Sequence, residues 1–259
     1  MIDVRDKFWL WAHEAGSYTG EHGLPGVSRI TPAEAASYLG IPNLIMVRYA
    51  GRPQPPFDQL ADSFRPIKQV VWSIVGARGE SSQRDLADVL DLAARFPNIT
   101  GVIMDDFFGA ADDGGRRVAM PLDTLHDVRS SLVAGGRRLD LWVVLYTEQL
   151  DEPVSQHLQL CGKVTLWTWQ AEQLRDLERN FARLQLLAPT MGKLLGCYMW
   201  DFAAARPMPL DLMQHQCELG LRWLKDGAIE GMIFLASSIC DLELEAVEWT
   251  RRLIKQITM

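Results

Sequence analysis

The sequence contains few cysteines, and no two of them have the CxxC spacing of a zinc or redox site. The four are Cys161, Cys197, Cys217 and Cys240. This number and spacing do not indicate a disulfide framework and predict reduced thiols in the core of a cytoplasmic protein. No apolar run reaches the roughly 20 residues that cross a membrane. The apolar segment FWLWAH (8–13) is too short and too aromatic for a signal peptide, so a cytoplasmic protein that does not bind membranes is expected, although a secreted protein trimmed of its leader would have the same sequence.

The sequence also lacks an excess of basic residues. It has 26 Lys and Arg against 33 Asp and Glu, a formal net charge of -7 and a pI of about 5.3. An acidic surface does not suit the phosphate backbone, so nucleic acid is not an expected partner. The glycine-containing segment HEAGSYTGEHG (13–23) does not have the GxGxxG spacing of a dinucleotide-binding turn.

Short β-branched or aromatic segments alternate with longer amphipathic ones along the whole chain. Strands are predicted at 8–13, 43–50, 68–76, 99–107, 139–148, 163–170, 194–202 and 231–238. Helices are predicted at 31–40, 57–64, 81–96, 121–136, 152–160, 171–187, 209–227 and 242–257. Thr31 is expected to cap the first helix, Ser81 or Ser82 the third, and Gly135 and Gly136 to end the fourth.

This alternation predicts a parallel sheet. Eight units of roughly 32 residues each match the size of one βα unit, and together they favour a closed eight-stranded (β/α)8 TIM barrel over an open sheet. No linker or low-complexity segment divides the sequence. A single barrel domain over residues 1–259 is therefore expected. The sequence does not indicate its oligomeric state.

Acidic and aromatic residues gather where the predicted strands end. In this fold the active site lies at the C-terminal ends of the strands. The candidate catalytic residues are Asp105, Asp106, Glu148 and Asp201. The candidate substrate-binding residues are His13, Glu14, Arg48, Trp72, Tyr146, Trp167, Trp169, Gln170 and Trp200.

The segment ITGVIMDDFFG (99–109) is the most informative of these strand ends, because an apolar run there ends in two adjacent carboxylates. Successive side chains of a strand point to opposite faces. If the strand stays extended, only one of Asp105 and Asp106 can point fully into the barrel, and the other is expected to cap the following loop or pair with an arginine. The sequence does not show which one points inward. The same alternation places Arg48 on a face with Leu44 and Met46, where we expect it inside the barrel as the partner of a carboxylate.

Aromatic walls combined with carboxylates suit a carbohydrate ligand, either a small molecule or an oligosaccharide. Flat rings cover the C–H faces of a sugar, while charged and amide groups bind its hydroxyls. The matching chemistry is cleavage of a glycosidic bond by two carboxylates. In this hypothesis Asp105 or Asp106 is the nucleophile or base, Glu148 or Asp201 is the acid, and no metal or cofactor is required.

The chain resembles the glycoside-hydrolase type of (β/α)8 barrel, most specifically at GVIMDDFF (101–108). Barrel chitinases carry a similar fourth strand, D-G-x-D-x-D-x-E. Alignment on Gly101 puts Asp105 on the last Asp of that pattern and Phe107 in place of its catalytic Glu. Families related to α-galactosidases are similar in having an Asp nucleophile that ends strand four. They have an Asp acid at the end of strand six, where Glu172 is the nearest acid here. The resemblance implies a glycosidase without identifying one family.

Other barrel chemistries lack residues that they need. The expected strand ends carry no lysine for a Schiff-base aldolase and no HxH for an amidohydrolase metal centre. The turns after strands seven and eight are not glycine-rich, which disfavours a sugar phosphate. Two alternatives remain open. One is a divalent-metal sugar isomerase or epimerase that uses Glu14, Asp106, Glu148 and Asp201. The other is a sugar-binding barrel without turnover.

Overall fold

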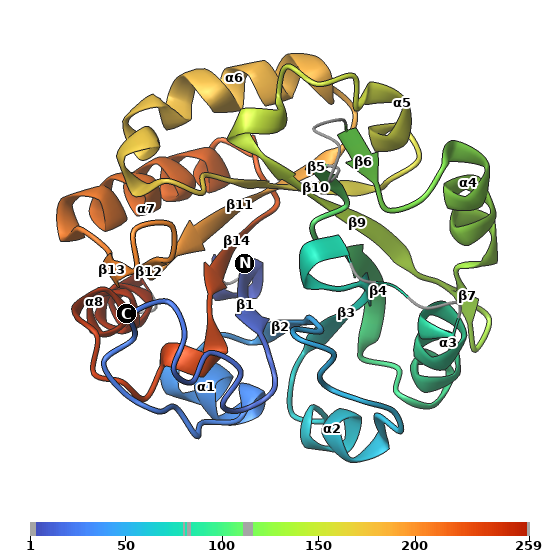
Figure 1. The fold of residues 1–259 in the computed structure, drawn as a ribbon, viewed down its shortest axis with the longest axis horizontal. Helices are drawn as coiled ribbons and strands as arrows, with labels where there is room; N and C mark the ends of the chain where they lie inside the picture. Colours follow the sequence, from blue (N-terminus) through green and yellow to red (C-terminus); the bar gives the residue numbers. More distant parts are fainter. Residues whose placement is uncertain (1–3, 80, 82–83, 111–115, 258–259) are drawn as a thin grey trace.

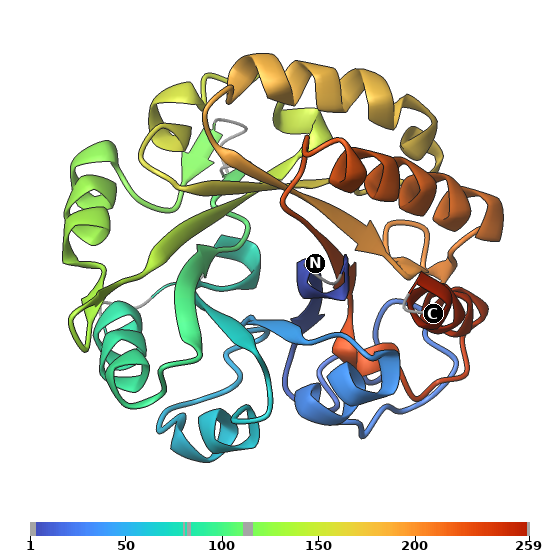
Figure 2. The same ribbon diagram turned by 180° about the vertical axis from the view of Figure 1, so that it is seen from behind.

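The computed structural model is a (β/α)8 TIM barrel (Figure 1), as the sequence predicted. It describes residues 4–79, 81, 84–110 and 116–257. Eight parallel strands close in the order β1-β14-β11-β10-β9-β4-β3-β2. The helices form an outer ring around them, and the view from behind shows the same ring (Figure 2). None of the helices in the described residues is both long and apolar enough to span a membrane.

The barrel strands are β1 (Phe8–Ala12), β2 (Asn43–Met46), β3 (Gln69–Val75), β4 (Ile99–Met104), β9 (Asp140–Tyr146), β10 (Lys163–Trp167), β11 (Gly192–Tyr198) and β14 (Gly231–Leu235). The α-helices are α1 (Pro32–Leu39), α2 (Asp58–Ser63), α3 (Asp85–Arg95), α4 (Leu122–Ser131), α5 (Ser155–Leu158), α6 (Leu177–Leu187), α7 (Leu210–Lys225) and α8 (Glu245–Ile257). Short 3₁₀ helices lie at Val4–Lys7, Ala77–Gly79, Thr147–Gln149, Ala171–Asp176 and Ser237–Ile239. Three small hairpins complete the chain: β5 (Phe108–Ala110) with β6 (Arg116–Val118), β7 (Val133–Ala134) with β8 (Arg137–Arg138), and β12 (Trp200–Asp201) with β13 (Arg206–Pro207).

The inside of the barrel is filled by indole rings. Trp9 of β1 meets Trp142 of β9 with ring centroids 4.8 Å apart, and Trp11 meets Trp167 at 5.1 Å. All four side chains are buried. Trp167 fits because β11 carries Gly196 beside it, where a Cβ atom would lie 2.1 Å from the indole ring. Large side chains from opposite strands thus close the barrel, as is usual for this fold.

Most element boundaries agree with the sequence, and the exceptions have local causes. Thr31 caps α1 in a capping box with Glu34, and Gly40 ends that helix with a φ of 72°, as predicted. Helix α3 is present as predicted, but its predicted cap was wrong, since the helix begins at Asp85 and Arg84 is its N-cap residue. Of its two expected caps, Ser82 lies outside the described residues.

Helix α4 ends earlier than predicted, at Ser131. Gly135 and Gly136 do not terminate it. They form the turn of the β7–β8 hairpin, where both have positive φ values of 54° and 75°. Two consecutive left-handed residues are typical of a tight hairpin turn, so the glycines were recognised as a turn signal but assigned to the wrong element.

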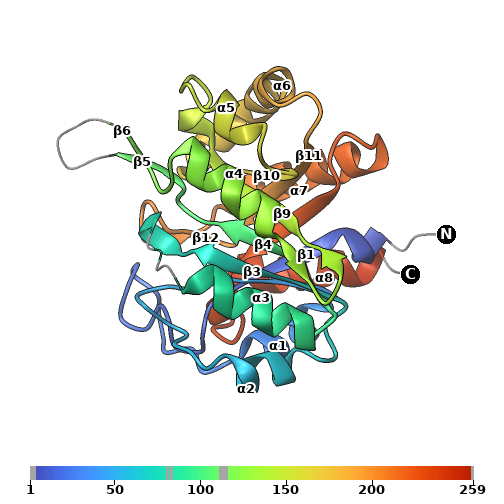
Figure 3. The ribbon, with the colours of Figure 1, turned by 90° about the vertical axis from the view of Figure 1, so that its right-hand side faces the viewer.

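The most consequential difference concerns the seventh barrel strand. The predicted strand 194–202 is two elements, because β11 ends at Tyr198 and Trp200 and Asp201 begin the antiparallel β12–β13 hairpin. The residue that this strand brings to the mouth of the barrel is therefore Tyr198. Figure 3 shows β12 on the side of the barrel where the β5–β6 hairpin also projects.

Candidate functional site

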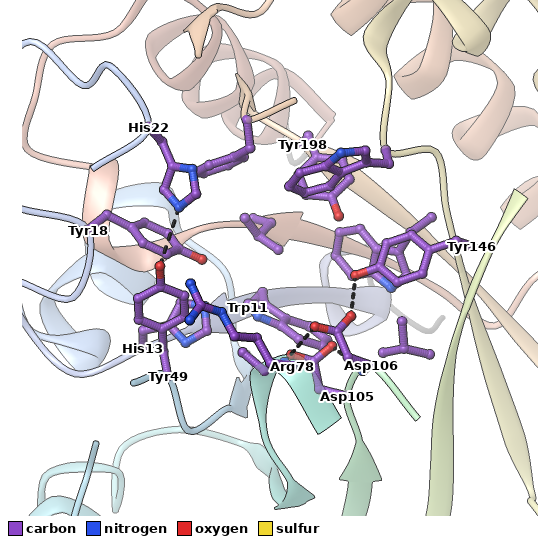
Figure 4. Close-up of a pocket in the computed structure, with 16 residues that line it drawn as sticks. Trp11, His13, Tyr18, His22, Tyr49, Arg78, Asp105, Asp106, Tyr146 and Tyr198 are labelled. Atoms are coloured by element: carbon purple, nitrogen blue, oxygen red, sulfur yellow. Dashed lines mark hydrogen bonds between the residues drawn. The ribbon is translucent and has the colours of Figure 1, made fainter. Parts of the chain in front are cut away.

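A pocket of about 220 Å³ opens at the C-terminal ends of the barrel strands. Ten of the residues that line it are labelled in Figure 4. The full lining is Trp11, His13, Tyr18, His22, Tyr49, Ala77, Arg78, Asp105, Asp106, Val144, Tyr146, Trp167, Trp169, Tyr198, Phe202 and Leu235. Trp11 and Trp167 form its floor. The pocket is thus aromatic on most sides, with two carboxylates at one side.

Both Asp105 and Asp106 line this pocket, directly after β4. The chain turns sharply between them because Asp106 has a φ of 44°, a left-handed conformation that is uncommon for residues other than glycine. The backbone N–H of Asp106 donates to Oδ1 of Asp105 at 2.9 Å. This turn explains how neighbouring side chains, which an extended strand would send to opposite faces, reach one cavity.

The carboxylate of Asp106 is held by two donors. The hydroxyl of Tyr146 donates to its Oδ1 at 2.8 Å, and the backbone N–H of Arg78 donates to its Oδ2 at 2.7 Å (Figure 4). Arg78 itself has a left-handed φ of 63°, which turns its N–H toward the carboxylate. Asp106 therefore has a fixed orientation set by β9 and by the loop after β3.

Asp105 differs from Asp106 in its surroundings. Its side chain is 6% exposed, and burial together with the charge of Asp106 raises its pKa well above the ordinary value. The backbone N–H of Asp106 opposes this change but does not outweigh it. A carboxyl group in an apolar site beside another carboxylate keeps its proton at higher pH than usual. Asp105 is thus suited to donate a proton.

His13 stands on another wall of the pocket and is 1% exposed. Its Nδ1 lies 3.0 Å from the carbonyl oxygen of Val47, and burial lowers the pKa of the ring to about 4. The imidazole is therefore neutral near pH 7. Because the carbonyl can only accept, Nδ1 carries the proton and Nε2 is left as an acceptor.

The remaining polar wall comes from the loop after β1. The ring of Tyr18 meets His13 and Tyr49 edge to face, with centroids 5.1 and 4.9 Å apart. The hydroxyl of Tyr49 donates to the carboxylate of Glu21 and lies 3.4 Å from Nε2 of His22. Burial and the neighbouring Glu21 raise the pKa of Tyr49 to about 12, so this hydroxyl stays protonated as a donor.

The structure brings together six of the thirteen residues proposed from the sequence. Those that line the pocket are Asp105, Asp106, His13, Tyr146, Trp167 and Trp169. They come from four different strand ends, which is the arrangement expected of a site on this fold. Their roles in binding and catalysis remain predictions.

The predicted position of Arg48 inside the barrel is wrong. Its guanidinium pairs with the carboxylate of Asp85 at the start of α3, between the barrel and the helices. Trp72 is on the same outer side, where its ring packs against Phe57 and Phe64 at 5.5 and 5.8 Å. Both faces of these strands are buried, so alternation alone did not show which one points inward.

The two predicted acids, Glu148 and Asp201, do not line the pocket. Glu148 is exposed in the 3₁₀ turn after β9. Asp201 is 2% exposed in the β12–β13 hairpin, where it accepts hydrogen bonds from Nε of Arg206 at 2.9 Å and from the backbone of Ala204 at 3.2 Å. Asp201 is thus a partner within the hairpin and is not presented to the cavity.

Three predicted substrate-binding residues also lie outside the lining. Trp200 is buried, and its indole N–H donates to the carbonyl of His22 at 2.9 Å. It therefore attaches the β12–β13 hairpin to the loop after β1. Gln170 is exposed and accepts a hydrogen bond from Gln173. Glu14 is half-buried beside the pocket residue His13 but does not line the cavity itself.

Several lining residues were missed from the sequence. Tyr18 and His22 belong to the loop 13–23, from which only His13 and Glu14 were proposed as substrate-binding residues. Tyr198 was missed because the predicted seventh strand continued past it to residue 202. Phe202 was missed because its position depends on the β12–β13 hairpin, which the sequence did not predict. Their common signal is the aromatic content of the loops that follow strand ends.

The described residues contain no group of three or more His, Cys, Asp or Glu side chains placed to hold a metal ion. The set suggested for a metal-dependent isomerase is dispersed, since Asp201 pairs with Arg206 and Glu148 is exposed. The metal-dependent hypothesis therefore gains no support from the positions of these residues.

No protein-family model matches the sequence. No curated protein matches it significantly either. Solved structures do match in fold. A xylanase-A-amylase inhibitor protein superposes with a TM-score of 0.59 at 13% identity, covering 97% of both chains. YKL-39, solved in the presence of chitooligosaccharides, gives 0.58 at 10% identity, covering 96% of this chain and 99% of that one.

A third structure of the same fold is the GH113 β-mannanase from Alicyclobacillus acidocaldarius, with a TM-score of 0.56 at 11% identity, covering 99% of this chain and 98% of that one. At these identities the likeness establishes the TIM-barrel fold. Any activity must be argued from the pocket itself.

Proposed function

We propose that this protein is a glycoside hydrolase, with Asp105 as the acid and Asp106 as the carboxylate that stabilises positive charge. The observation that carries the proposal is the arrangement of Asp105 and Asp106. A buried acid with a raised pKa lies next to a carboxylate fixed by two donors, in a pocket walled by aromatic rings. Such a separation of acid and base roles by environment is typical of glycosidases.

In this mechanism a sugar ring occupies the aromatic pocket, and its glycosidic oxygen takes the proton of Asp105 as the C–O bond breaks. Positive charge develops on the sugar, and the carboxylate of Asp106 lowers the energy of that state. A water molecule then adds to the anomeric carbon, and its proton returns to Asp105. The assignment revises the sequence-based hypothesis, which gave the acid role to Glu148 or Asp201.

Structures solved for other barrels support this class without specifying it. The β-mannanase acts on a glycan, as its name says, and it has the same fold. The sugar-binding barrel without turnover remains the second candidate, because YKL-39 was solved in the presence of chitooligosaccharides and also shares the fold.

The test is product release from a panel of aryl glycosides and oligosaccharides, with and without a chelator. The wild type is compared with Asp105→Asn, Asp106→Asn and the control Glu148→Gln, whose carboxylate is exposed and outside the pocket. Turnover that resists the chelator and is lost in both Asn variants, but not in the control, supports the proposal. Saturable sugar binding without product would replace it by the non-catalytic alternative. Turnover that the chelator abolishes would contradict this metal-independent mechanism, and no turnover on any substrate would favour the isomerase or the non-catalytic barrel.

A further inference from the structure

The pocket carries negative charge and has almost no positive charge of its own. Arg78 is the sole Lys or Arg side chain among the described lining residues, and it is exposed at the mouth. Figure 4 shows its guanidinium directed toward Tyr49, while its backbone N–H serves Asp106. Arg48, which could have neutralised the pocket, is occupied by Asp85 on the outer side of the barrel. His13 is neutral near pH 7.

The two aspartates together hold one proton and one negative charge when Asp105 is protonated. The Asp106 carboxylate is fixed by neutral donors, a tyrosine hydroxyl and a backbone N–H, neither of which cancels its charge. No described residue donates a hydrogen bond to Oδ2 of Asp105, the oxygen left over by the Asp106 N–H. The negative charge of Asp106 is half-buried and has no oppositely charged partner among the described residues, which leaves room for a ligand to supply one.

The rings around the carboxylates favour the same kind of ligand. Tyr146 donates a hydrogen bond to Asp106 (Figure 4), and Tyr198, Trp11 and Trp167 line the same pocket. The face of an aromatic ring attracts a cation, most strongly when the cation is desolvated. The pocket is thus complementary to a positive charge through both its carboxylate and its π systems.

We propose that the sugar bound here carries a protonated exocyclic amino group, so that the substrate class is an amino sugar or its glycoside. This inference rests on the proposed function for the sugar itself. The ammonium group would be held by the charge of Asp106 and by the neighbouring ring faces. Asp105 would keep its proton for the leaving oxygen.

The test measures the affinities of three matched ligands by calorimetry at pH 6.5. Glucosamine, glucose and N-acetylglucosamine differ only at carbon 2, and the corresponding galacto series is measured beside them. We expect the amine to bind at least about ten-fold more tightly than both neutral sugars in one of the series, which corresponds to 1.4 kcal/mol or more.

Three variants locate the source of this preference. Asp106→Asn removes the charge and should reduce the preference to less than about three-fold. Asp105→Asn keeps the charge of the pair and should retain the preference. Tyr146→Phe removes one hydrogen bond to Asp106 without changing the charge, so it should retain the preference too. Thermal unfolding of each variant shows whether it is folded.

The outcomes separate this inference from the proposed function. If the amino sugars bind no more tightly than the neutral sugars, and the neutral sugars are bound or hydrolysed, the amino-sugar inference is wrong and the proposed glycosidase function stands. Tight binding of a ring-nitrogen analogue such as deoxynojirimycin, without a preference for the exocyclic amine, also overturns it, because that pattern reports the cationic transition state. Binding of choline without binding of any sugar overturns both the amino-sugar inference and the carbohydrate function, and it would show a site for a cation that is not a sugar. If none of these ligands binds, both are wrong.

Discussion

Asp105 and Asp201 are buried to a similar degree, but one lines the pocket and the other is paired within a hairpin. Both are aspartates just beyond the C-terminal end of a barrel strand, 6% and 2% exposed. Asp201 is paired with Arg206 and a backbone N–H inside one hairpin. Asp105 faces the pocket, receives one backbone hydrogen bond and has a carboxylate as its neighbour. Asp105 is therefore presented to the pocket with a raised pKa, whereas the carboxylate of Asp201 is engaged inside its hairpin.

The largest expected difference between the two sites is in turnover. Asp105→Asn should lower kcat by about 10²- to 10⁴-fold, because a positioned general acid contributes on that order. Asp201→Asn should change kcat by less than about ten-fold, since its carboxylate does not reach the cavity and acts only through the hairpin. Steady-state kinetics on the best substrate of the panel measures both. Comparable losses in the two variants would remove the distinction between them.

His13 extends the comparison to a buried base without a charged partner. Its pKa is lowered from 6.5 to about 4, so the folded state favours the neutral ring. The corresponding stability is complete above pH 6.5 and is lost as the pH falls toward 4, up to about 3 kcal/mol.

The control for His13 is His13→Asn, which keeps a donor for the Val47 carbonyl but does not titrate. Urea unfolding at pH 7 and at pH 4.5 should show a smaller loss of stability in this variant than in the wild type. The same pH slope in both proteins would show that His13 is not the group responsible.

Stability at pH 7 should change in opposite directions at the two aspartates. Asp201→Asn removes an ion pair and weakens the hairpin, and the unfolding free energy should fall by about 1 to 3 kcal/mol. Asp105 has a raised pKa in the folded state. Its contribution is therefore complete below the unfolded pKa, near 3.8, and is lost as the pH rises.

The side chain of the Asp105→Asn variant does not ionise, so this variant does not lose stability in this way as the pH rises. Its amide oxygen can still accept from the Asp106 N–H. Its unfolding free energy should be unchanged or higher than that of the wild type at pH 7. Denaturant titrations of both variants give the sign directly. A clear loss of stability for Asp105→Asn would mean that its carboxyl group supports the fold instead of the site.

The smallest effect is expected at Glu148. It lies next to the barrel mouth in sequence but is exposed and outside the pocket. Glu148→Gln should change stability by less than about 0.5 kcal/mol, as most surface substitutions do. Its kcat/KM should stay within about two-fold of the wild type. A ten-fold loss in kcat/KM would show that the acid reaches the bound substrate.

The barrel and part of the site were predictable because they follow from local patterns. Alternating apolar segments define the eight units, and an apolar run that ends in Asp105 and Asp106 has to deliver them to the mouth of the barrel. The position of Arg48 was not predictable, because its partner Asp85 is far along the chain and both faces of β2 are buried. The end of β11 was not predictable either, because the segment CYMWDF (197–202) contains no Gly or Pro to mark the change from barrel to hairpin.

The turn at Asp106 was also hidden from the sequence. A left-handed aspartate next to a strand end has no distinct residue pattern, yet this conformation brings two adjacent side chains to one cavity. Strand alternation predicted that one of the two aspartates faces the pocket, whereas both of them line it.

The indole floor built by Trp11 and Trp167 over Trp9 and Trp142 makes the cavity a cul-de-sac. The pocket opens at the C-terminal ends of the strands, so a ligand that enters it cannot pass through the barrel. In a hydrolase, a product therefore has to leave by the opening through which the next substrate enters.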